Sequence, residues 1–164
     1  MTAFLAALAA DHVGNWDICK REGLWGVPHS GHAERAALAV VPGDTIFIWR
    51  SKAPRMPGGL LARATATGIA IPATDPPWPD RDRYRYVFSI RVDEELSIPI
   101  GDRFPGNRTS VFPGNRTSVL FEVPNMTVNW GFGRISTATE RKMTVALHGR
   151  WPLGTIAVAA RPKT

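Results

Sequence analysis

The sequence predicts a mainly β domain with short helices, of the α+β class, folded as a small barrel of five or six strands. Short stretches rich in Val, Ile, Thr and aromatic residues favour strands. The 15 glycines and 14 prolines place turns between them. The 164 residues are enough for one compact domain with its own core. Short strands joined by tight turns are typical of a curled sheet or barrel.

The first half of the chain supplies strands and two short helices. Ala3-Phe4-Leu5 is predicted to begin the first strand, and Asn15 to Glu22 to form a helix that Asn15 caps. Leu24 to Pro28 is expected to form an irregular corner, and His32 to Leu38 a second helix. The nearly continuous apolar run Thr45 to Trp49 predicts a central strand.

The second half continues the pattern. Leu60 to Ile71 predicts a strand interrupted at Gly68, and Pro72 to Pro79 a rigid loop. Tyr84 to Val92 alternates aromatic or apolar residues with polar ones, which predicts a strand with one wet, basic face. Thr137 and Glu140 are expected to form the capping box of a helix that ends near Leu147.

An eight-residue segment occurs twice in succession, at Phe104 to Val111 and at Phe112 to Val119. Two copies are too few for a solenoid. We therefore predict a single domain over residues 1–164 that carries the duplication at 104–119 as a longer loop. Deleting Phe112 to Val119 should leave the thermal midpoint nearly unchanged.

The charge balance points to a polyanionic partner. The formal net charge is +6, the isoelectric point is about 10.2, and most of the 20 basic residues are arginine. Arginine pairs with phosphate in a planar, two-pronged geometry, which favours nucleic acid. The alternative is an arginine-rich composition with solvated side chains. The single cysteine, Cys19, excludes an internal disulfide and favours the cytoplasm, and no apolar run is long enough to span a membrane.

The residues of common catalytic and metal sites are not grouped in this sequence. The four histidines stand at no recognised ligand spacing, and Cys19 lies in the predicted short helix beside Trp16 and Ile18, so it is expected to pack as a small hydrophobe. The acidic run Asp93-Glu94-Glu95 is interpreted as a strand-end turn. We expect no enzyme activity, no metal and no cofactor.

The six tryptophans are the most informative feature. Trp49 and Trp151 are expected in the core. Trp25 and Trp78 stand beside Gly or Pro on segments predicted to be irregular and exposed. Two such rings and one amide could form a pocket for an extruded base, because an aromatic face stacks on any base.

The segment Asn15-Trp16-Asp17-Ile18-Cys19-Lys20-Arg21-Glu22-Gly23-Leu24-Trp25-Gly26-Val27 resembles the opening signature of EVE domains. These belong to the PUA-like superfamily of small β-barrels and are related to the YTH readers of modified bases. The resemblance continues, in the expected order, through residues 42–44, 59–66, 75–78, 84–92 and 130–136. The first strand and the turn at 11–14 depart from the EVE pattern.

The resemblance implies roles for individual residues. In YTH domains an asparagine ten positions before a pocket tryptophan binds the base edge, and Asn15 stands ten before Trp25. Trp25 and Trp78 would then be the walls, the backbone at Gly26 would meet the exocyclic group, and Trp16 would complete the base-binding set. The alternative makes Asn15 only a helix cap and Trp25 a core residue. Phosphate contacts are expected from Lys20, Lys52, Arg108, Arg116 and Arg134.

The function implied is a reader that holds a modified base, methylated or hydroxymethylated, in an aromatic cage. DNA is the expected target, with the chain acting as the recognition part of a modification-dependent restriction or defence system beside a fused or partner nuclease. The alternative is an RNA-binding module for modified RNA. A third alternative, an enzyme on small nucleotides, needs an acid or a thiol in the pocket, and Asp17 is the one acid expected near Asn15 and Trp25.

Overall fold

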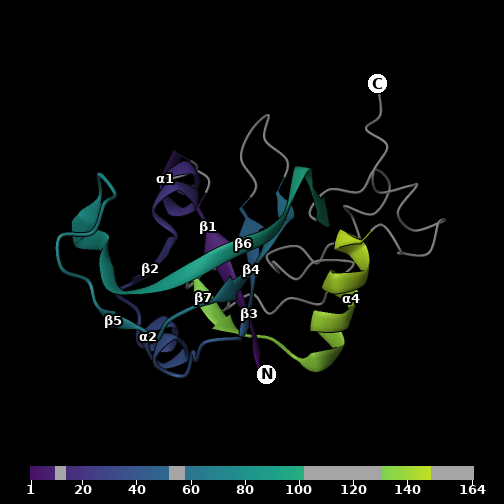
Figure 1. The fold of residues 1–164 in the computed structure, drawn as a ribbon, viewed down its shortest axis with the longest axis horizontal. Coiled ribbons are helices and arrows are strands. Elements are labelled where there is room, and N and C mark those ends of the chain that lie inside the picture. Colours follow the sequence, from purple (N-terminus) through teal and green to yellow (C-terminus); the bar gives the residue numbers. More distant parts are fainter. Residues whose placement is uncertain (10–13, 52–57, 102–130, 149–164) are drawn as a thin grey trace, which may run out of the picture.

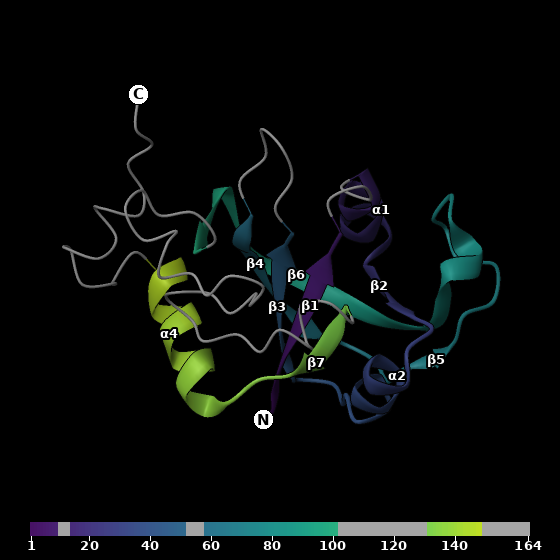
Figure 2. The ribbon, with the colours of Figure 1, turned by 180° about the vertical axis from the view of Figure 1, so that it is seen from behind.

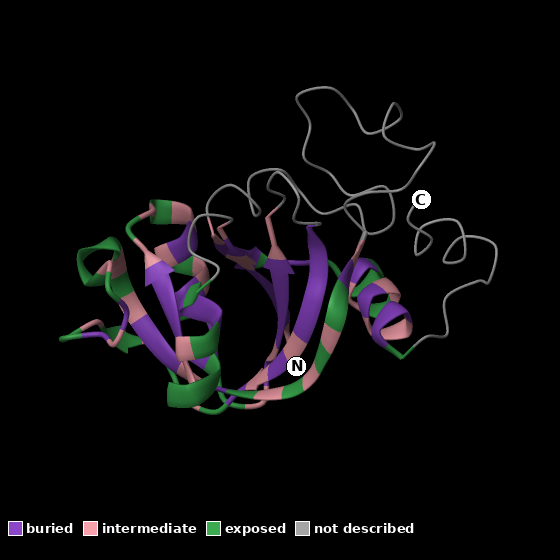
Figure 3. Ribbon diagram, turned by 90° about the horizontal axis from the view of Figure 1, so that it is seen from above, coloured by how far each residue is buried: buried purple, intermediate pink, exposed green. Residues whose placement is uncertain are grey.

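A computed structural model describes residues 1–9, 14–51, 58–101 and 131–148. These residues form one curled sheet with short helices around it, which confirms the predicted mainly β, α+β class (Figure 1, Figure 3). The sheet order is β2-β6-β4-β3-β1-β7, and β5 pairs with β6 beside this path. In this order β2 and β7 are the two ends of the described sheet, which curls as a half-barrel.

The strands are β1 (Ala3–Leu8), β2 (Leu24–Pro28), β3 (Thr45–Arg50), β4 (Gly59–Ala66), β5 (Ile71–Pro72), β6 (Tyr84–Gly101) and β7 (Phe132–Arg134). The helices are α1 (Gly14–Glu22), α2 (Gly31–Leu38) and α4 (Thr137–Leu147), with a 3-10 turn, η2, at Arg81–Arg83. Front and rear views both place α4 at one end of the sheet and α1 and α2 at the other (Figure 1, Figure 2). Within the described ranges, no helix is long and apolar enough to cross a membrane.

The sheet is antiparallel except where β1 pairs with β3. β1 runs parallel to β3, from Ala3 opposite Thr45 to Leu8 opposite Arg50, and pairs on its other side with β7. The first and the last described strands are therefore neighbours. The predicted first strand and the predicted central strand are both confirmed.

Side chains of β1 and β3 alternate between two hydrophobic clusters, one on each face of the sheet. We call the cluster shared with α1 and α2 the pocket-side core; it includes Phe4 and Ile48. The α4-side core lies on the other face and includes Leu5, Phe47 and Met143. Because successive strand residues point to opposite faces, a strand buried on both sides is apolar throughout, as residues 46–49 are.

Two segments differ from the sequence-based expectation. Leu24 to Pro28 forms strand β2, with Trp25 opposite Phe88 of β6, and is not an irregular corner. Its glycine and proline are tolerated because β2 is an edge strand and Pro28 is its last residue. The acidic run 93–95 lies inside β6, which continues to Gly101, and is not a strand-end turn.

The helix ends agree with the prediction more closely than the caps do. α4 spans Thr137–Leu147, as expected, but its N-cap is Ser136, whose Oγ accepts a hydrogen bond from the Thr139 backbone N–H at 3.1 Å. The capping box on Thr137 is therefore wrong by one position. The duplicated segment at 104–119 lies outside the described residues, so its dispensability stays a prediction.

Candidate functional site

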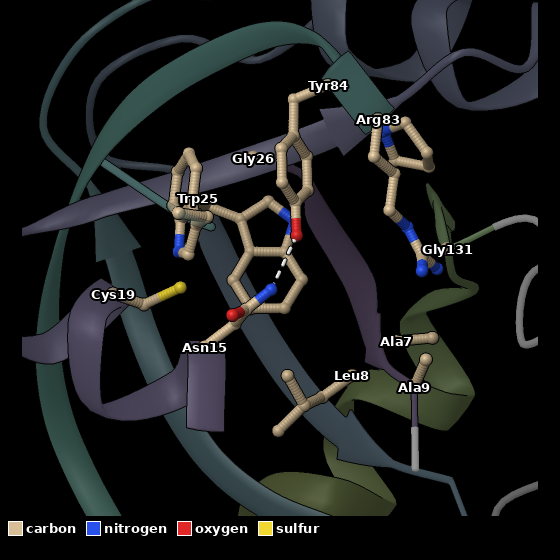
Figure 4. Close-up of a pocket in the computed structure, with 12 residues that line it drawn as sticks. Ala7, Leu8, Ala9, Asn15, Cys19, Trp25, Gly26, Arg83, Tyr84 and Gly131 are labelled. Carbon is tan, nitrogen blue, oxygen red and sulfur yellow. Dashed lines mark hydrogen bonds between the residues drawn. The ribbon is translucent and has the colours of Figure 1, made fainter. Parts of the chain in front are cut away.

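A small pocket lies where α1, β2 and the beginning of β6 meet the end of β1 (Figure 4). Its volume is about 40 Å³. Four residues predicted from the sequence line it together: Asn15, Trp25, Gly26 and Trp78. The rest of the lining comes from Ala7, Leu8, Ala9, Cys19, Pro28, Arg83, Tyr84 and Gly131.

Trp16, the fifth predicted base-binding residue, does not line this pocket. Its indole N–H donates a 2.6 Å hydrogen bond to Oε2 of Glu95 on β6. Neighbouring residues of an α-helix are rotated by about 100° around its axis, so Trp16 and Asn15 cannot face the same way. Cys19, four residues after Asn15, shares its face and does line the pocket.

The Asn15 amide is held by two long-range partners. Asn15 lies inside the first turn of α1, and its Nδ2 donates to Oδ1 of Asp80 at 3.0 Å and to the Tyr84 hydroxyl at 2.9 Å. The Tyr84 hydroxyl in turn donates to Oδ2 of Asp80 at 3.4 Å. The expectation that Asn15 caps the helix is therefore wrong, because its side chain is used in this triangle.

Tyr84 and Asp80 are site residues that the sequence analysis missed. Asp80 also corrects the expectation that Asp17 is the one acid near Asn15. Burial raises the pKa of the Tyr84 hydroxyl to about 12, and the charge of Asp80 adds to this shift. Tyr84 is therefore a neutral hydrogen-bonding phenol near neutral pH. Its ring packs against Trp78, with centroids 4.7 Å apart and planes at 45°.

Gly26 lets these rings lie directly on strand β2. A Cβ at this position would lie 2.5 Å from Cδ1 of Tyr84 and 3.0 Å from Cζ3 of Trp78. Atoms of real side chains do not approach so closely, so any other residue would push the rings away. The glycine is therefore part of the pocket wall through its missing side chain.

The two tryptophans are buried and not exposed as the sequence suggested. Trp25 is 4% exposed and Trp78 is 1% exposed. Neither indole N–H has a hydrogen-bond partner among the described residues. A buried donor without a partner costs about 1–3 kcal/mol. Two such donors at one pocket are unusual in a folded protein, since nearly all buried polar groups are paired.

Cys19 is the small buried hydrophobe that the sequence predicted. It is 3% exposed, and burial raises the pKa of its thiol to about 12. The nearby Trp78 indole opposes this shift without forming a hydrogen bond of good geometry. The thiol is therefore protonated near neutral pH, which makes it a poor nucleophile.

No family model and no curated protein matches this sequence. Solved structures do match. One is a YTH domain of Toxoplasma CPSF4 in complex with a 7-mer m6A-modified RNA: the TM-score is 0.58 at 12% identity, covering 91% of this chain and 93% of that one. The chain has the YTH fold. A hypothetical protein from Leishmania major is also similar in fold to this chain, with a TM-score of 0.61 at 10% identity over 93% of this chain and 98% of that one.

A third solved structure with the YTH fold is the YTH domain of Zygosaccharomyces rouxii MRB1 in complex with N6-methyladenosine RNA. Its TM-score is 0.53 at 13% identity, with 91% of this chain and 88% of that chain covered. Identities this low show a common fold, which agrees with the resemblance that carried the sequence-based prediction.

Around the pocket of this YTH fold, the basic residues differ in what they contact. Lys20 is already paired with Glu95 at 3.1 Å and with Asp17 at 3.5 Å. Arg134 is exposed on β7, with its guanidinium 5.9 Å from the Phe4 ring centroid. Arg83, which the sequence analysis did not select, is exposed and lines the pocket (Figure 4). Lys52, Arg108 and Arg116 lie outside the described residues.

A second, wider cavity of about 300 Å³ lies on the other side of Tyr84. Its lining includes His29, Asp75, Arg81, Asp82 and Arg85. Arg81 is paired with Asp75, so part of this charge is already neutralised. No group of three or more His, Cys, Asp or Glu residues suited to a metal ion occurs in the described part of the chain.

Proposed function

We propose that this chain is a nucleic-acid reader that takes one modified base, methylated or hydroxymethylated, into the pocket between Trp25 and Trp78. The observation that carries the proposal is the pocket itself. It combines two buried indoles whose N–H groups lack partners, the amide of Asn15, and a glycine at position 26 that leaves room for aromatic rings to pack against β2. The two aromatic side chains support a base as the ligand, since the face of an aromatic ring stacks on any base.

The physical gain would come from stacking and burial. Stacking a base on one aromatic side chain is worth roughly 1–3 kcal/mol. A methyl group that enters the cage adds about 0.8 kcal/mol of burial, plus dispersion contacts with the rings. Preference for the modified base therefore depends on how closely the walls fit the methyl group.

The pocket must widen when a base enters. A cavity of about 40 Å³ holds a few water molecules at most. A base is larger, and the Tyr84 ring, which packs over Gly26 and against Trp78, occupies part of the space between the walls. The pocket would then open by a movement of the Tyr84 side chain toward the second cavity, which leaves room for it.

RNA is the first target that we propose, and DNA the second. Two of the YTH domains that share this fold were solved with RNA that carries N6-methyladenosine or m6A. DNA is favoured by the resemblance of residues 15–27 to the EVE signature. A part in a restriction or defence system with a partner nuclease belongs to this second proposal.

We also propose that the chain performs no chemistry of its own. Cys19 and Asp80 do supply a thiol and an acid close to the pocket, as a nucleotide enzyme would need. The thiol is held protonated by its burial, and the carboxylate accepts hydrogen bonds from Asn15 and Tyr84. Incubation with nucleotides and oligonucleotides should leave both unchanged by mass spectrometry.

The deciding experiment measures binding to matched single-stranded RNA and DNA oligonucleotides with and without one modified base, at a fixed salt concentration. Trp25→Ala and Trp78→Ala should each weaken binding by about ten- to a hundredfold. Trp49→Phe is the matched control, because Trp49 is equally buried but lies in the α4-side core. Circular dichroism checks that each variant is folded. Folded pocket variants that bind as well as the parent would overturn the proposal.

A further inference from the structure

The orientation of the Asn15 amide is determined by its partners. Its Nδ2 faces Oδ1 of Asp80 at 3.0 Å and the hydroxyl of Tyr84 at 2.9 Å, so both amide hydrogens are directed at protein acceptors. A carboxylate can only accept hydrogen bonds. If the amide were turned over, its carbonyl oxygen would lie against a carboxylate oxygen with no hydrogen between them. Asp80 therefore excludes the turned-over amide.

One polar atom of Asn15 is left for a ligand, and it is an acceptor. The carbonyl oxygen Oδ1 lies on the side of the amide opposite to Tyr84 (Figure 4). The hydrogen bonds that the Asn15 side chain makes to described residues both use Nδ2, which leaves Oδ1 without a donor from them, and Asn15 is 8% exposed and lines the pocket. This acceptor is therefore available to a donor on the molecule that fills the pocket.

We propose that Asp80 is a positioning residue that turns the carbonyl oxygen of Asn15 toward the pocket, and that the pocket selects a base which presents an N–H to this oxygen and not to the backbone at Gly26, as the resemblance implied. The inference rests on the proposed function and specifies the base edge. Adenine and cytosine keep one N–H on the exocyclic nitrogen after a single methylation, so both fit. A base that carries an oxygen in place of that N–H does not fit, because two acceptors would then face each other.

The test uses pairs of bases that differ only in this N–H. One pair is N6-methyladenine and 6-methoxypurine, and the other is N4-methylcytosine and its 4-methoxy analogue. In each pair an ether oxygen replaces the N–H while the methyl group and the ring remain. Each base is placed in the same single-stranded RNA and DNA sequence. The parent protein should bind the N–H member of a pair about tenfold or more tightly than the ether member.

Two variants test whether Asp80 orients the Asn15 amide or only supports the structure around it. Asp80→Asn keeps the size of the side chain but can donate as well as accept, so the Asn15 amide can take either orientation, and the difference within a pair should fall to about threefold or less. Tyr84→Phe is the matched control, since it removes one acceptor and leaves Asp80 in place. It should weaken binding of both members while keeping their ratio. In the free protein, Asp80→Asn should also shift the side-chain amide resonance of Asn15 and speed its hydrogen exchange.

The outcomes distinguish this inference from the proposed function. A parent protein that prefers modified over unmodified bases but binds both members of each pair equally overturns the inference and leaves the function standing. A ratio that is unchanged in Asp80→Asn overturns the role of Asp80. Binding that is the same for every modified and unmodified oligonucleotide overturns the proposed function, and the inference with it.

Discussion

The two cores on opposite faces of the sheet are both built from buried hydrophobic residues, but they differ in where their unpaired polar atoms lie. In the α4-side core, Trp49 has an interaction partner, and the Glu94 carboxylate beside this core joins Arg63 and His148, each at 2.8 Å. In the pocket-side core, the indole N–H groups of Trp25 and Trp78 have no partner among the described residues. The Nε of Arg63, beside the α4-side core, is unpaired as well, so the difference is that the two unpaired indole donors both belong to residues that line one pocket.

The difference teaches where function can be sought when a protein has little sequence similarity to known ones. Apolar packing is explained by the stability that it contributes. A buried donor without a partner lowers stability, so it calls for another explanation. Here the unpaired donors and the unused oxygen of Asn15 surround one pocket, and this coincidence separates a binding site from an ordinary core.

The largest effect that tests this contrast is a cavity in the α4-side core. Phe47 is fully buried there, so Phe47→Ala should lower the free energy of unfolding by about 3–5 kcal/mol. Urea denaturation measures the loss. Because Phe47 does not line the pocket, the affinity of the molecules that remain folded should be unchanged. A matching loss of affinity per folded molecule would mean that the two faces are not independent.

The thiol of Cys19 tests how well the pocket-side core excludes water. Burial raises its pKa from 9.0 to about 12, a difference of about three units. At pH 8 the thiolate should therefore be about a thousandfold rarer in the folded than in the unfolded protein, and alkylation should slow accordingly. Folding stability should be highest below pH 9 and fall as the pH rises toward 12, because the unfolded chain releases this proton first. Fast alkylation of the native protein would show that water reaches Cys19 in the pocket.

A methyl group at Gly26 should damage the pocket face specifically. The new Cβ of Gly26→Ala would lie 2.5 Å from the Tyr84 ring, so we expect a loss of about 1–3 kcal/mol in stability and weaker binding. Gly68→Ala is the matched control, because its Cβ would meet only Ser89, at 3.5 Å or more. Thermal melts and binding to the modified oligonucleotide compare the two variants. Equal behaviour of both would contradict the tight ring packing at Gly26.

The smallest effect is expected at the acidic pair in β6. Glu94 binds Arg63 and His148, whereas Glu95 binds Trp16 and Lys20. Glu94→Gln and Glu95→Gln should each lower the free energy of unfolding by about 1 kcal/mol or less, because these pairs are partly open to solvent. Added salt should reduce the effect of Glu94→Gln further. A loss of several kcal/mol at Glu94 would show that α4 depends on this contact more than on its apolar face.

The sequence contained enough to predict the fold and four residues of the pocket. Periodicity identified the strands, and the spacing of Asn15 and Trp25 carried the resemblance to base readers. It did not predict that Tyr84 and Asp80 hold Asn15, since they are separated from it by 69 and 65 positions and no local pattern reveals such contacts. One signal was available: Asn15 and Cys19 are four apart on a helix, which excludes Trp16 from their face.

Two corrections concern strands whose residue types are more common in turns and loops. Gly26 and Pro28 were interpreted as signs of an irregular segment, but both lie in an edge strand. There the glycine leaves room for aromatic rings to pack against the strand, and a proline at the last position does not break a hydrogen bond of the sheet. Residues 93–95 were interpreted as a turn because of their charge. In the structure Glu94 and Glu95 are adjacent on β6. Glu94 contacts His148 at the end of α4, and Glu95 accepts a hydrogen bond from Trp16 of α1.

The parallel pairing of β1 with β3 and its antiparallel pairing with β7 have a consequence for how the chain folds. β1 lies between partners that begin at Thr45 and Phe132. Contacts between residues so distant in the chain form slowly, because a long loop must close before they stabilise anything. On the ribosome, β1 cannot obtain its second partner until residues 132–134 have emerged. One edge of β1 should therefore stay open during most of synthesis, and refolding should be slow, with β1 among the last amides to gain protection from hydrogen exchange.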